Sequence, residues 1–270
     1  MSSFVSRILV VVVALPVVLY LVWLGGWWIT SLALVAAVLA LHELYVMGRS
    51  LRPLVLAGYA GAVLTLVGAE AGGYPWMLGG ALATLPLAFA LYGISDTRQS
   101  ATVALGTTVL GVVWIPLALG HLVLLRDIPE HGRLAVFTVL LAVFADSTFA
   151  YVVGRLIGRH RLAPTISPGK SVEGFIAGTI AAVAVCFFAL YEDRDTFLTI
   201  WQALVFGAIV AAAEPVGDLF ESAIKRDLQV KDSGRLLAGH GGVLDRIDSL
   251  LFAGPAALYA ILAFGYGGAA

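Results

Sequence analysis

Long apolar runs alternate with short polar connections along the chain. Nine of the runs are near the length of about 20 residues that lets a helix cross a bilayer. Their ranges are 8–24, 27–47, 53–69, 75–94, 101–124, 133–157, 173–191, 199–221 and 249–268. Because each run is continuous, without a period of two, the pattern predicts helices and not the strands of a β-barrel. We therefore expect an all-α, polytopic integral membrane protein with about nine transmembrane helices.

Composition narrows the class further. The 270 residues are 60% hydrophobic and 12% charged, whereas soluble domains carry about 25% charged residues. This hydrophobicity excludes intrinsic disorder, and the presence of one cysteine, Cys186, excludes a disulfide scaffold. The net charge of −1 gives no basic field, so nucleic acid is not an expected partner.

The distribution of positive charge predicts the orientation. With nine spans, the side that holds the N-terminus carries 13 of the 16 Lys and Arg residues, and the other side carries Arg126, Arg133 and Arg194. By the positive-inside rule, the N-terminus and the long connections 158–172 and 222–248 are cytoplasmic and the C-terminus is outside. The first run continues through Leu24, which favours an uncleaved helix over a signal peptide. We expect one integral domain, with N-terminal helices in 1–132 and catalytic helices and loops in 133–270.

Carboxylates inside apolar runs are the first candidates for function, because burying a charge in a bilayer is unfavourable. Asp146 lies within the run 133–157 and is either functional or a buried group hydrogen-bonded to a neighbouring helix. In the run 199–221, Glu214, Asp218 and Glu221 or Ser222 recur at a spacing that places them on one helix face. Clustered carboxylates suit Mg²⁺, which takes oxygen ligands and leaves coordination positions open for phosphate.

The connection 222–248 holds nine charged residues, five cationic and four anionic. Lys225 and Arg226 are placed to bind phosphate. Glycines flank His240, where the backbone can approach an anion closely. Asp245 and Asp248 follow at a spacing of three, before the last apolar run. Acids, bases and glycines together at a membrane surface indicate a metal–phosphate site.

The connection 158–172 contributes further candidates. The segment 167–173 precedes a long apolar run and is typical of a helix start. Glu173 lies near the first turn, where an acid either complements the helix dipole or serves the site. Lys170 is either a phosphate-binding residue or a charge that sets the topology.

The run 222–248 resembles the signature of the phosphatidate cytidylyltransferases, also called CDP-diacylglycerol synthases. The matching positions are Ser222, Ile224, Lys225, Arg226, Lys231, Asp232, His240, Gly241, Gly242, Val243, Asp245, Arg246, Ile247 and Asp248. Ala238 departs from the pattern, which usually has Pro there. Segments around Asp146 and Ser167–Gly174 are also similar, so the resemblance covers about 140–270.

The resemblance implies condensation of CTP with phosphatidic acid to CDP-diacylglycerol and pyrophosphate, in the cell (inner) membrane with the active site facing the cytoplasm. It implies Mg²⁺ dependence, a second cation for which K⁺ is the candidate, and a homodimer. Asp218 and Asp245 are the implied metal ligands, and together with Lys225 and Arg226 they form the implied catalytic set. The implied substrate-binding residues are Asp146, Ser167, Lys170, Glu173, Ser222, Lys231, His240, Gly241, Gly242, Arg246 and Asp248.

Two alternatives stay open at this point. An enzyme acting on an ether-linked archaeal lipid would share the headgroup chemistry, so these motifs do not separate the two. An ion-coupled secondary transporter would use Asp146, Glu214 and Asp218 as an ion path. The transporter explains the buried carboxylates but leaves the constellation of the connection 222–248 without a role.

Overall fold

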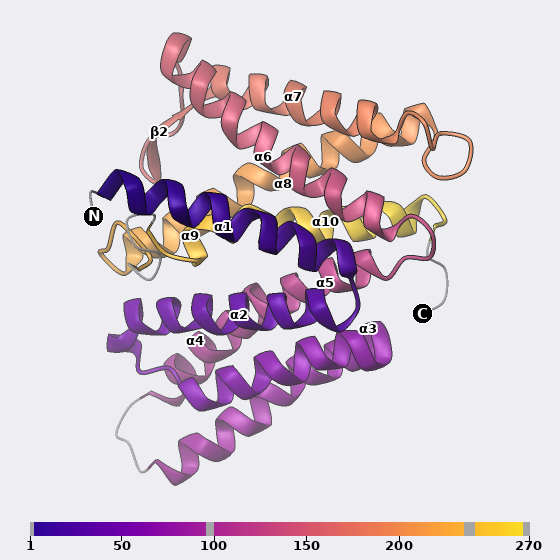
Figure 1. Ribbon diagram of the computed structural model, residues 1–270. Coiled ribbons are helices and arrows are strands. Elements are labelled where there is room, and N and C mark those ends of the chain that lie inside the picture. Colours follow the sequence, from indigo (N-terminus) through magenta and orange to yellow (C-terminus); the bar gives the residue numbers. More distant parts are fainter. Residues whose placement is uncertain (1–2, 96–99, 235–240, 267–270) are drawn as a thin grey trace. The chain divides into compact units, whose positions relative to one another are not determined.

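The computed structural model describes residues 3–95, 100–234 and 241–266, with side chains from residue 14 onward (Figure 1). Helices dominate, and one short pair of strands interrupts them. The elements are α1 (Ser3–Leu24), α2 (Trp27–Met47), the 3₁₀ helix η1 (Arg49–Leu51), α3 (Val55–Ile94), α4 (Ala101–Trp114), α5 (Pro116–Arg126), α6 (Gly132–Ile157), β1 (Arg161–Ala163), β2 (Ser167–Ser171), α7 (Val172–Leu190), α8 (Ile200–Asp227), α9 (Leu244–Ile247) and α10 (Leu250–Ala263).

The chain divides into two compact units. The N-terminal unit comprises residues 1–124 and 228–247, and the C-terminal unit comprises 125–227 and 248–270. The segment 228–247, which carries much of the loop motif, therefore packs with the N-terminal helices.

In the N-terminal unit, α2 packs against α1, α3, α4 and α9. Helix α3 is broken at Gly72 and Gly73, and the φ of Gly73 is 66°. This left-handed conformation favours glycine, and Pro75 follows two residues later. The break divides α3 into two arms that fall on the expected spans 53–69 and 75–94.

The two arms of α3 pack closely through small residues. A Cβ atom on Gly68 would overlap the backbone of Trp76, and one on Gly80 would overlap the backbone of Leu64. Helices inside a bilayer gain little from the hydrophobic effect, so close backbone approach through glycine is a main source of their packing energy. These glycines therefore hold the two arms together.

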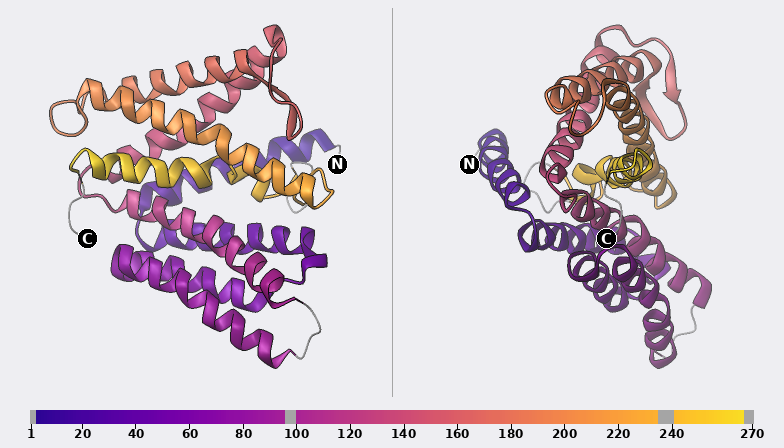
Figure 2. Two further views of the ribbon diagram at one scale, coloured as in Figure 1. Left: turned by 180° about the vertical axis from the view of Figure 1, so that it is seen from behind. Right: turned by 90° about the vertical axis from the view of Figure 1, so that its right-hand side faces the viewer.

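The C-terminal unit is a bundle in which α7 packs against both α6 and α8, and α10 packs against α8 and α6 (Figure 2). Strands β1 and β2 form an antiparallel hairpin in which Arg161 pairs with Ser171 and Ala163 with Ser167. The hairpin contacts α6 and α7. It is thereby placed beside α6, which carries the buried Asp146.

Within the described residues, each of the nine expected apolar ranges lies largely on a helix. Among the described residues, seven helical segments are long and apolar enough to cross a membrane, with α4 and α5 counted as one segment and α9 and α10 as another. The kinked α3 is also counted once. The chain is therefore an all-α, multi-pass membrane protein, while the count of nine spans and the orientation of the termini remain predictions. The hairpin was not expected, and Ser167–Ser171 forms β2 where a helix start was anticipated. Helix α7 begins directly after it, and Ser171 caps it by accepting a hydrogen bond from the Gly174 amide at 3.1 Å.

Candidate active site

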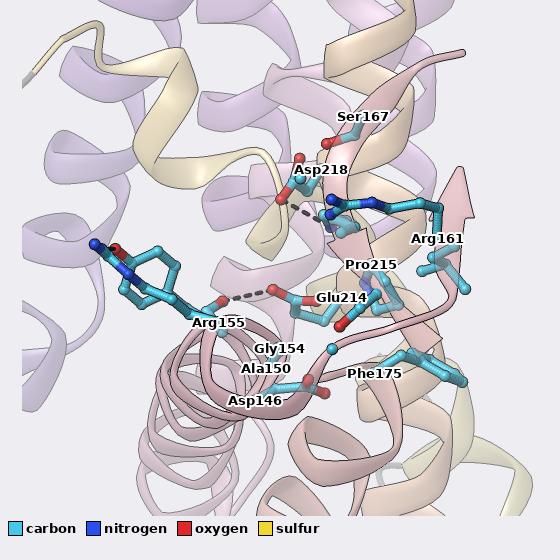
Figure 3. Close-up of a pocket in the computed structure, with 17 residues that line it drawn as sticks. Asp146, Ala150, Gly154, Arg155, Arg161, Ser167, Phe175, Glu214, Pro215 and Asp218 are labelled. Carbon is cyan, nitrogen blue, oxygen red and sulfur yellow. Dashed lines mark hydrogen bonds and ion pairs between the residues drawn. The ribbon is translucent and has the colours of Figure 1, made fainter. Parts of the chain in front are cut away.

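A cavity of about 560 Å³ lies within the C-terminal unit, lined by α6, the hairpin, the start of α7, and α8 (Figure 3). Its lining combines carboxylates with cationic side chains. These are Asp146, Glu214 and Asp218 on one hand and Arg155, Arg161 and Lys170 on the other. Such a lining suits a polyanion that is bound together with a cation, because the cationic side chains attract phosphate and the carboxylates attract a metal ion.

The hairpin reaches α8 through an ion pair. The Lys170 ammonium lies 2.8 Å from Asp218 Oδ2, and both side chains are about two-thirds or more buried. The Ser222 hydroxyl, one turn further along α8, donates to Asp218 Oδ1 at 3.3 Å. Both oxygens of Asp218 are thus engaged by groups that the sequence had singled out.

Deeper in the cavity, two carboxylates are almost fully buried. Glu214 is 4% exposed and accepts hydrogen bonds from the hydroxyls of Ser147 at 2.5 Å and Ser249 at 3.2 Å. Asp146 is 1% exposed, and its Oδ2 has no hydrogen-bond partner among the described residues. In the view of Figure 3, Glu214 lies between Asp146 and Asp218. A buried oxygen without a partner is unfavourable, which points to a bound group at Asp146.

Lys225 and Arg226, expected to bind phosphate, are engaged elsewhere. The Lys225 ammonium lies 2.8 Å from Glu221, which is 1% exposed. The Arg226 Nε donates to the carbonyl of Ile166 in the hairpin at 3.4 Å. Neither residue lines the cavity. In these positions they anchor the end of α8 and the turn of the hairpin.

Glu173 also holds the hairpin. Its carboxylate accepts hydrogen bonds from the amides of Arg159 at 3.1 Å and His160 at 3.3 Å, and it lies 2.7 Å from His160 Nδ1. Glu173 thereby ties the start of α7 to the chain entering β1. Its place in the first turn of α7 agrees with the predicted position, and a direct contact with substrate remains a prediction.

Asp248 lies beside α8. It is 8% exposed, and its Oδ1 accepts a hydrogen bond from the Ser249 amide at 2.7 Å. A Cβ atom on Gly217 would overlap the Asp248 carbonyl oxygen. Gly217, which directly precedes Asp218 in α8, thus lets the helix approach the backbone at Asp248.

The N-terminal unit holds the remaining part of the motif. Asp245 accepts hydrogen bonds from the amides of Ser233 at 3.2 Å and Gly242 at 3.0 Å. Gly241 has a φ of 83°, a conformation that side chains disfavour. The side chains of Lys231 and Arg246 are exposed, and His240 lies outside the described residues. The carboxylate of Asp245 therefore closes the loop that joins α8 to α9.

The expected site residues are thus partly brought together. Asp146, Ser167, Lys170 and Asp218 line one cavity. Asp218 and Asp245 belong to different units, so their shared metal ion remains a prediction.

The oxygen donors of the cavity fit Mg²⁺. The described residues contain no cluster of three or more His, Cys, Asp and Glu side chains that could hold a metal ion. Mg²⁺ does not require one, because it is usually held by one or two carboxylates together with waters and substrate phosphates. The carboxylate of Asp218, about two-thirds buried at the cavity, and the unpartnered oxygen of Asp146 offer that chemistry.

Several residues at these sites were not singled out from the sequence. Arg155 and Arg161 line the cavity, but neither was among the expected site residues. Ser147 was passed over, although it directly follows Asp146. In the N-terminal unit, Glu43 is 2% exposed and binds the loop that contains Asp245. The same criterion that selected Asp146, a carboxylate within an apolar run, would have found it.

A helical membrane protein with a cavity lined by carboxylates and cations has a fold and a lining that suit a membrane enzyme acting on phosphate esters. The comparison with protein families makes this specific. The sequence model of the Cytidylyltransferase family matches residues 5–264. The chain belongs to this family and is a nucleotidyltransferase.

Similar proteins agree with this assignment. A protein of Staphylococcus haemolyticus named phosphatidate cytidylyltransferase is 32% identical over 92% of this chain and 95% of its own length. Its namesake from Mycobacterium bovis is 36% identical over 88% of this chain and 81% of its own length. That of Bacillus subtilis is 32% identical over 96% and 97%, respectively.

Proposed function

We propose that this protein transfers CMP from CTP to phosphatidate, giving CDP-diacylglycerol and pyrophosphate. The observation that carries the proposal is the cavity in the C-terminal unit, where Lys170 and Asp218 form an ion pair beside two buried carboxylates. The names of the relatives indicate phosphatidate as the lipid substrate. The carboxylates and cations that line the cavity suit phosphate groups bound together with a metal ion.

The reaction is a substitution at the α-phosphorus of CTP. A phosphate oxygen of phosphatidate forms the new P–O bond, and the bond from the α-phosphorus to the bridging oxygen of pyrophosphate breaks. A phosphomonoester has a second pKa of about 6, so the attacking phosphate is largely dianionic at pH 7. No general base is then needed, and the main task is to bring two polyanions together.

The side chains of the cavity perform that task by binding and orienting charge. Lys170, Arg155 and Arg161 provide three positive charges within one cavity, and arginine can bind a phosphate through two parallel hydrogen bonds. The Tyr151 hydroxyl accepts a hydrogen bond from Arg155 Nη1 at 2.7 Å, which orients the guanidinium. Electrostatic stabilisation of this kind is usually the largest contribution to such transfers.

Asp218 and Asp245 are the Mg²⁺ ligands that the family resemblance implies, and Asp146 offers a further oxygen. When bound, Mg²⁺ neutralises phosphate charge and orients the leaving group. The family resemblance adds K⁺ as the candidate second cation and a homodimer as the assembly. In this proposal phosphatidate keeps its acyl chains in the bilayer of the inner membrane, and the cavity faces the cytoplasm, which the excess of positive charge on that side supports.

The test is the formation of a lipid-soluble nucleotide by purified protein in lipid bilayers containing phosphatidate. We expect Mg²⁺-dependent incorporation of cytidine label into lipid, and loss of more than about 100-fold in rate in Asp218→Asn. The matched control is Asp227→Asn, at the exposed end of the same helix, which should keep wild-type activity. Label incorporation with an ether-linked lipid phosphate and not with phosphatidate would move the assignment to the ether-lipid enzyme. No incorporation with either lipid would refute it.

A further inference from the structure

The proposed reaction does not use the buried carboxylate of Glu43 in the N-terminal unit. Glu43 lies in α2, within an apolar run, and is 2% exposed. Burying a charge in an apolar helix is strongly unfavourable unless donors compensate it. Its partners therefore indicate what the residue does.

Among the described residues, the donors that bind Glu43 lie in the loop between α8 and α9. Oε1 accepts from the Val243 amide at 3.0 Å, and Oε2 accepts from the Leu244 amide at 2.9 Å. The Ser233 hydroxyl donates to Oε2 at 3.3 Å. One carboxylate thus joins both ends of the loop, at residues about 200 positions away in the sequence.

Two glycines make room for this contact. A Cβ atom on Gly242 would lie 2.6 Å from Glu43 Oε2, and one on Gly234 would overlap Oε1. Any side chain at either position would displace the carboxylate. The glycines that the sequence offered for close approach to an anion thus include one that accommodates an anion of the protein itself.

The same loop holds Asp245. Ser233 donates its hydroxyl to Glu43 and its amide to Asp245, and Gly242 donates its amide to Asp245 while Val243 and Leu244 donate theirs to Glu43. The two carboxylates therefore share one set of neighbouring donors. Loss of Glu43 would leave two buried amides without an acceptor next to the Asp245 peptide.

We propose that Glu43 is a positioning residue that holds Ser233 and the segment 241–245 in the conformation that presents Asp245. The proposal rests on the proposed function, because Asp245 matters to it as an assigned metal ligand. In this role Glu43 does not contact the substrate, and it acts through the backbone amides of Val243 and Leu244. In this proposal Glu43, on the N-terminal helix α2, supports a loop whose motif lies in the C-terminal half of the sequence.

The test compares Glu43→Gln with a matched control, Glu70→Gln. Glu43→Gln keeps the shape of the side chain, but places an amide NH₂ group against backbone donors. Glu70 lies in the same unit and accepts a hydrogen bond from the Thr30 hydroxyl at 2.8 Å, away from the loop. The first readout is amide hydrogen exchange of the segment 241–249 in full-length protein without substrate or metal. The second is the Mg²⁺ concentration that gives half-maximal transfer, together with kcat.

We expect faster exchange of the segment 241–249 in Glu43→Gln only. We also expect a rise of about 10- to 100-fold in the half-maximal Mg²⁺ concentration or an equal fall in kcat, the range found when supporting partners of a metal ligand are removed. Ser233→Ala removes one donor and should shift both readouts less, in the same direction, which provides the test if Glu43→Gln does not fold.

The outcomes separate the two proposals. Unchanged exchange and unchanged Mg²⁺ dependence in a folded, active Glu43→Gln protein would overturn the positioning role. Equal changes in Glu70→Gln would also overturn it, because they would show a general loss of stability. Inactive wild-type protein would refute the proposed function alone, since the exchange experiment still reports whether Glu43 holds the loop.

Discussion

Lys170 of the hairpin lies 2.8 Å from Asp218 of α8. This ion pair joins a connection that the sequence read as a polar loop to the acidic face of a long helix. It also places the cationic group at the cavity, where, in the proposed reaction, a substrate phosphate would replace Asp218 as its partner. The proposal therefore links the placement of the hairpin to the binding of substrate.

Replacing Lys170 should weaken the binding of CTP. In Lys170→Gln we expect the KM for CTP to rise by about 10-fold or more, since a charge-assisted contact to phosphate contributes about 1.5–3 kcal/mol. Steady-state kinetics at saturating phosphatidate measure it. Arg194→Gln, which removes a cation of the same unit that does not line the cavity, serves as the control, and an equal KM for the two variants would contradict the role of Lys170.

The buried carboxylate of Asp146 is predicted to lower the stability of the protein while supporting turnover. Asp146→Asn removes a buried charge whose Oδ2 lacks a hydrogen-bond partner among the described residues, so the melting temperature should stay equal to that of the wild type or rise. Turnover should fall by about 10-fold or more, because the site loses a carboxylate. Thermal unfolding and transfer rates on the same preparation check both.

A neighbouring threonine controls for the effect of removing a buried polar atom. Thr138 lies in the same helix, and its hydroxyl also lacks a partner among the described residues. Thr138→Val should keep both stability and turnover. If Asp146→Asn behaves in the same way and retains full turnover, Asp146 has no role in the reaction.

Glu173 should control the order of the hairpin. In Glu173→Gln the amides of Arg159 and His160 lose a charged acceptor, and limited trypsin digestion should cut after Arg159 and Arg161 faster than in the wild type. Glu192→Gln, which changes an exposed acid after the other end of α7, should leave the digestion unchanged. Equal rates in all three proteins would show that Glu173 does not hold the hairpin.

Adjacent glycines in α3 test how its arms pack. Gly80→Ala should destabilise the protein by about 1–3 kcal/mol, because its Cβ atom would overlap the backbone at Leu64. Gly79 has no atom within 4 Å of an added Cβ, so Gly79→Ala should be neutral or slightly stabilising. Unfolding in detergent measures the difference, and equal melting temperatures would contradict the close packing of the arms.

The positions of the apolar helices could be predicted from the sequence because the hydrophobic requirement of a bilayer acts on each segment separately. Asp146 could be found for the same reason, since a carboxylate is unfavourable wherever it is buried in an apolar run. The hairpin could not, because strands of three and five residues give too short a pattern for recognition. The Glu43 contact joins residues about 200 positions apart, and local patterns carry no information about such pairing.

The grouping of motif residues also depended on tertiary structure. The motif places Lys225 and Lys231 six positions apart, yet the two lie in different units. The motif identified the chemistry, while the contacts show that Lys225 pairs with Glu221 and that Lys170, from another connection, reaches Asp218.

The most direct measurement of the central claim follows the two ends of the CTP triphosphate. Wild-type protein in bilayers containing phosphatidate and Mg²⁺ receives CTP labelled at either the α- or the γ-phosphate. Transfer of CMP predicts that the α label enters the lipid fraction, and that the γ label appears in water as pyrophosphate in equal amount. The γ label in lipid, or neither label in lipid with folded protein, would contradict the account.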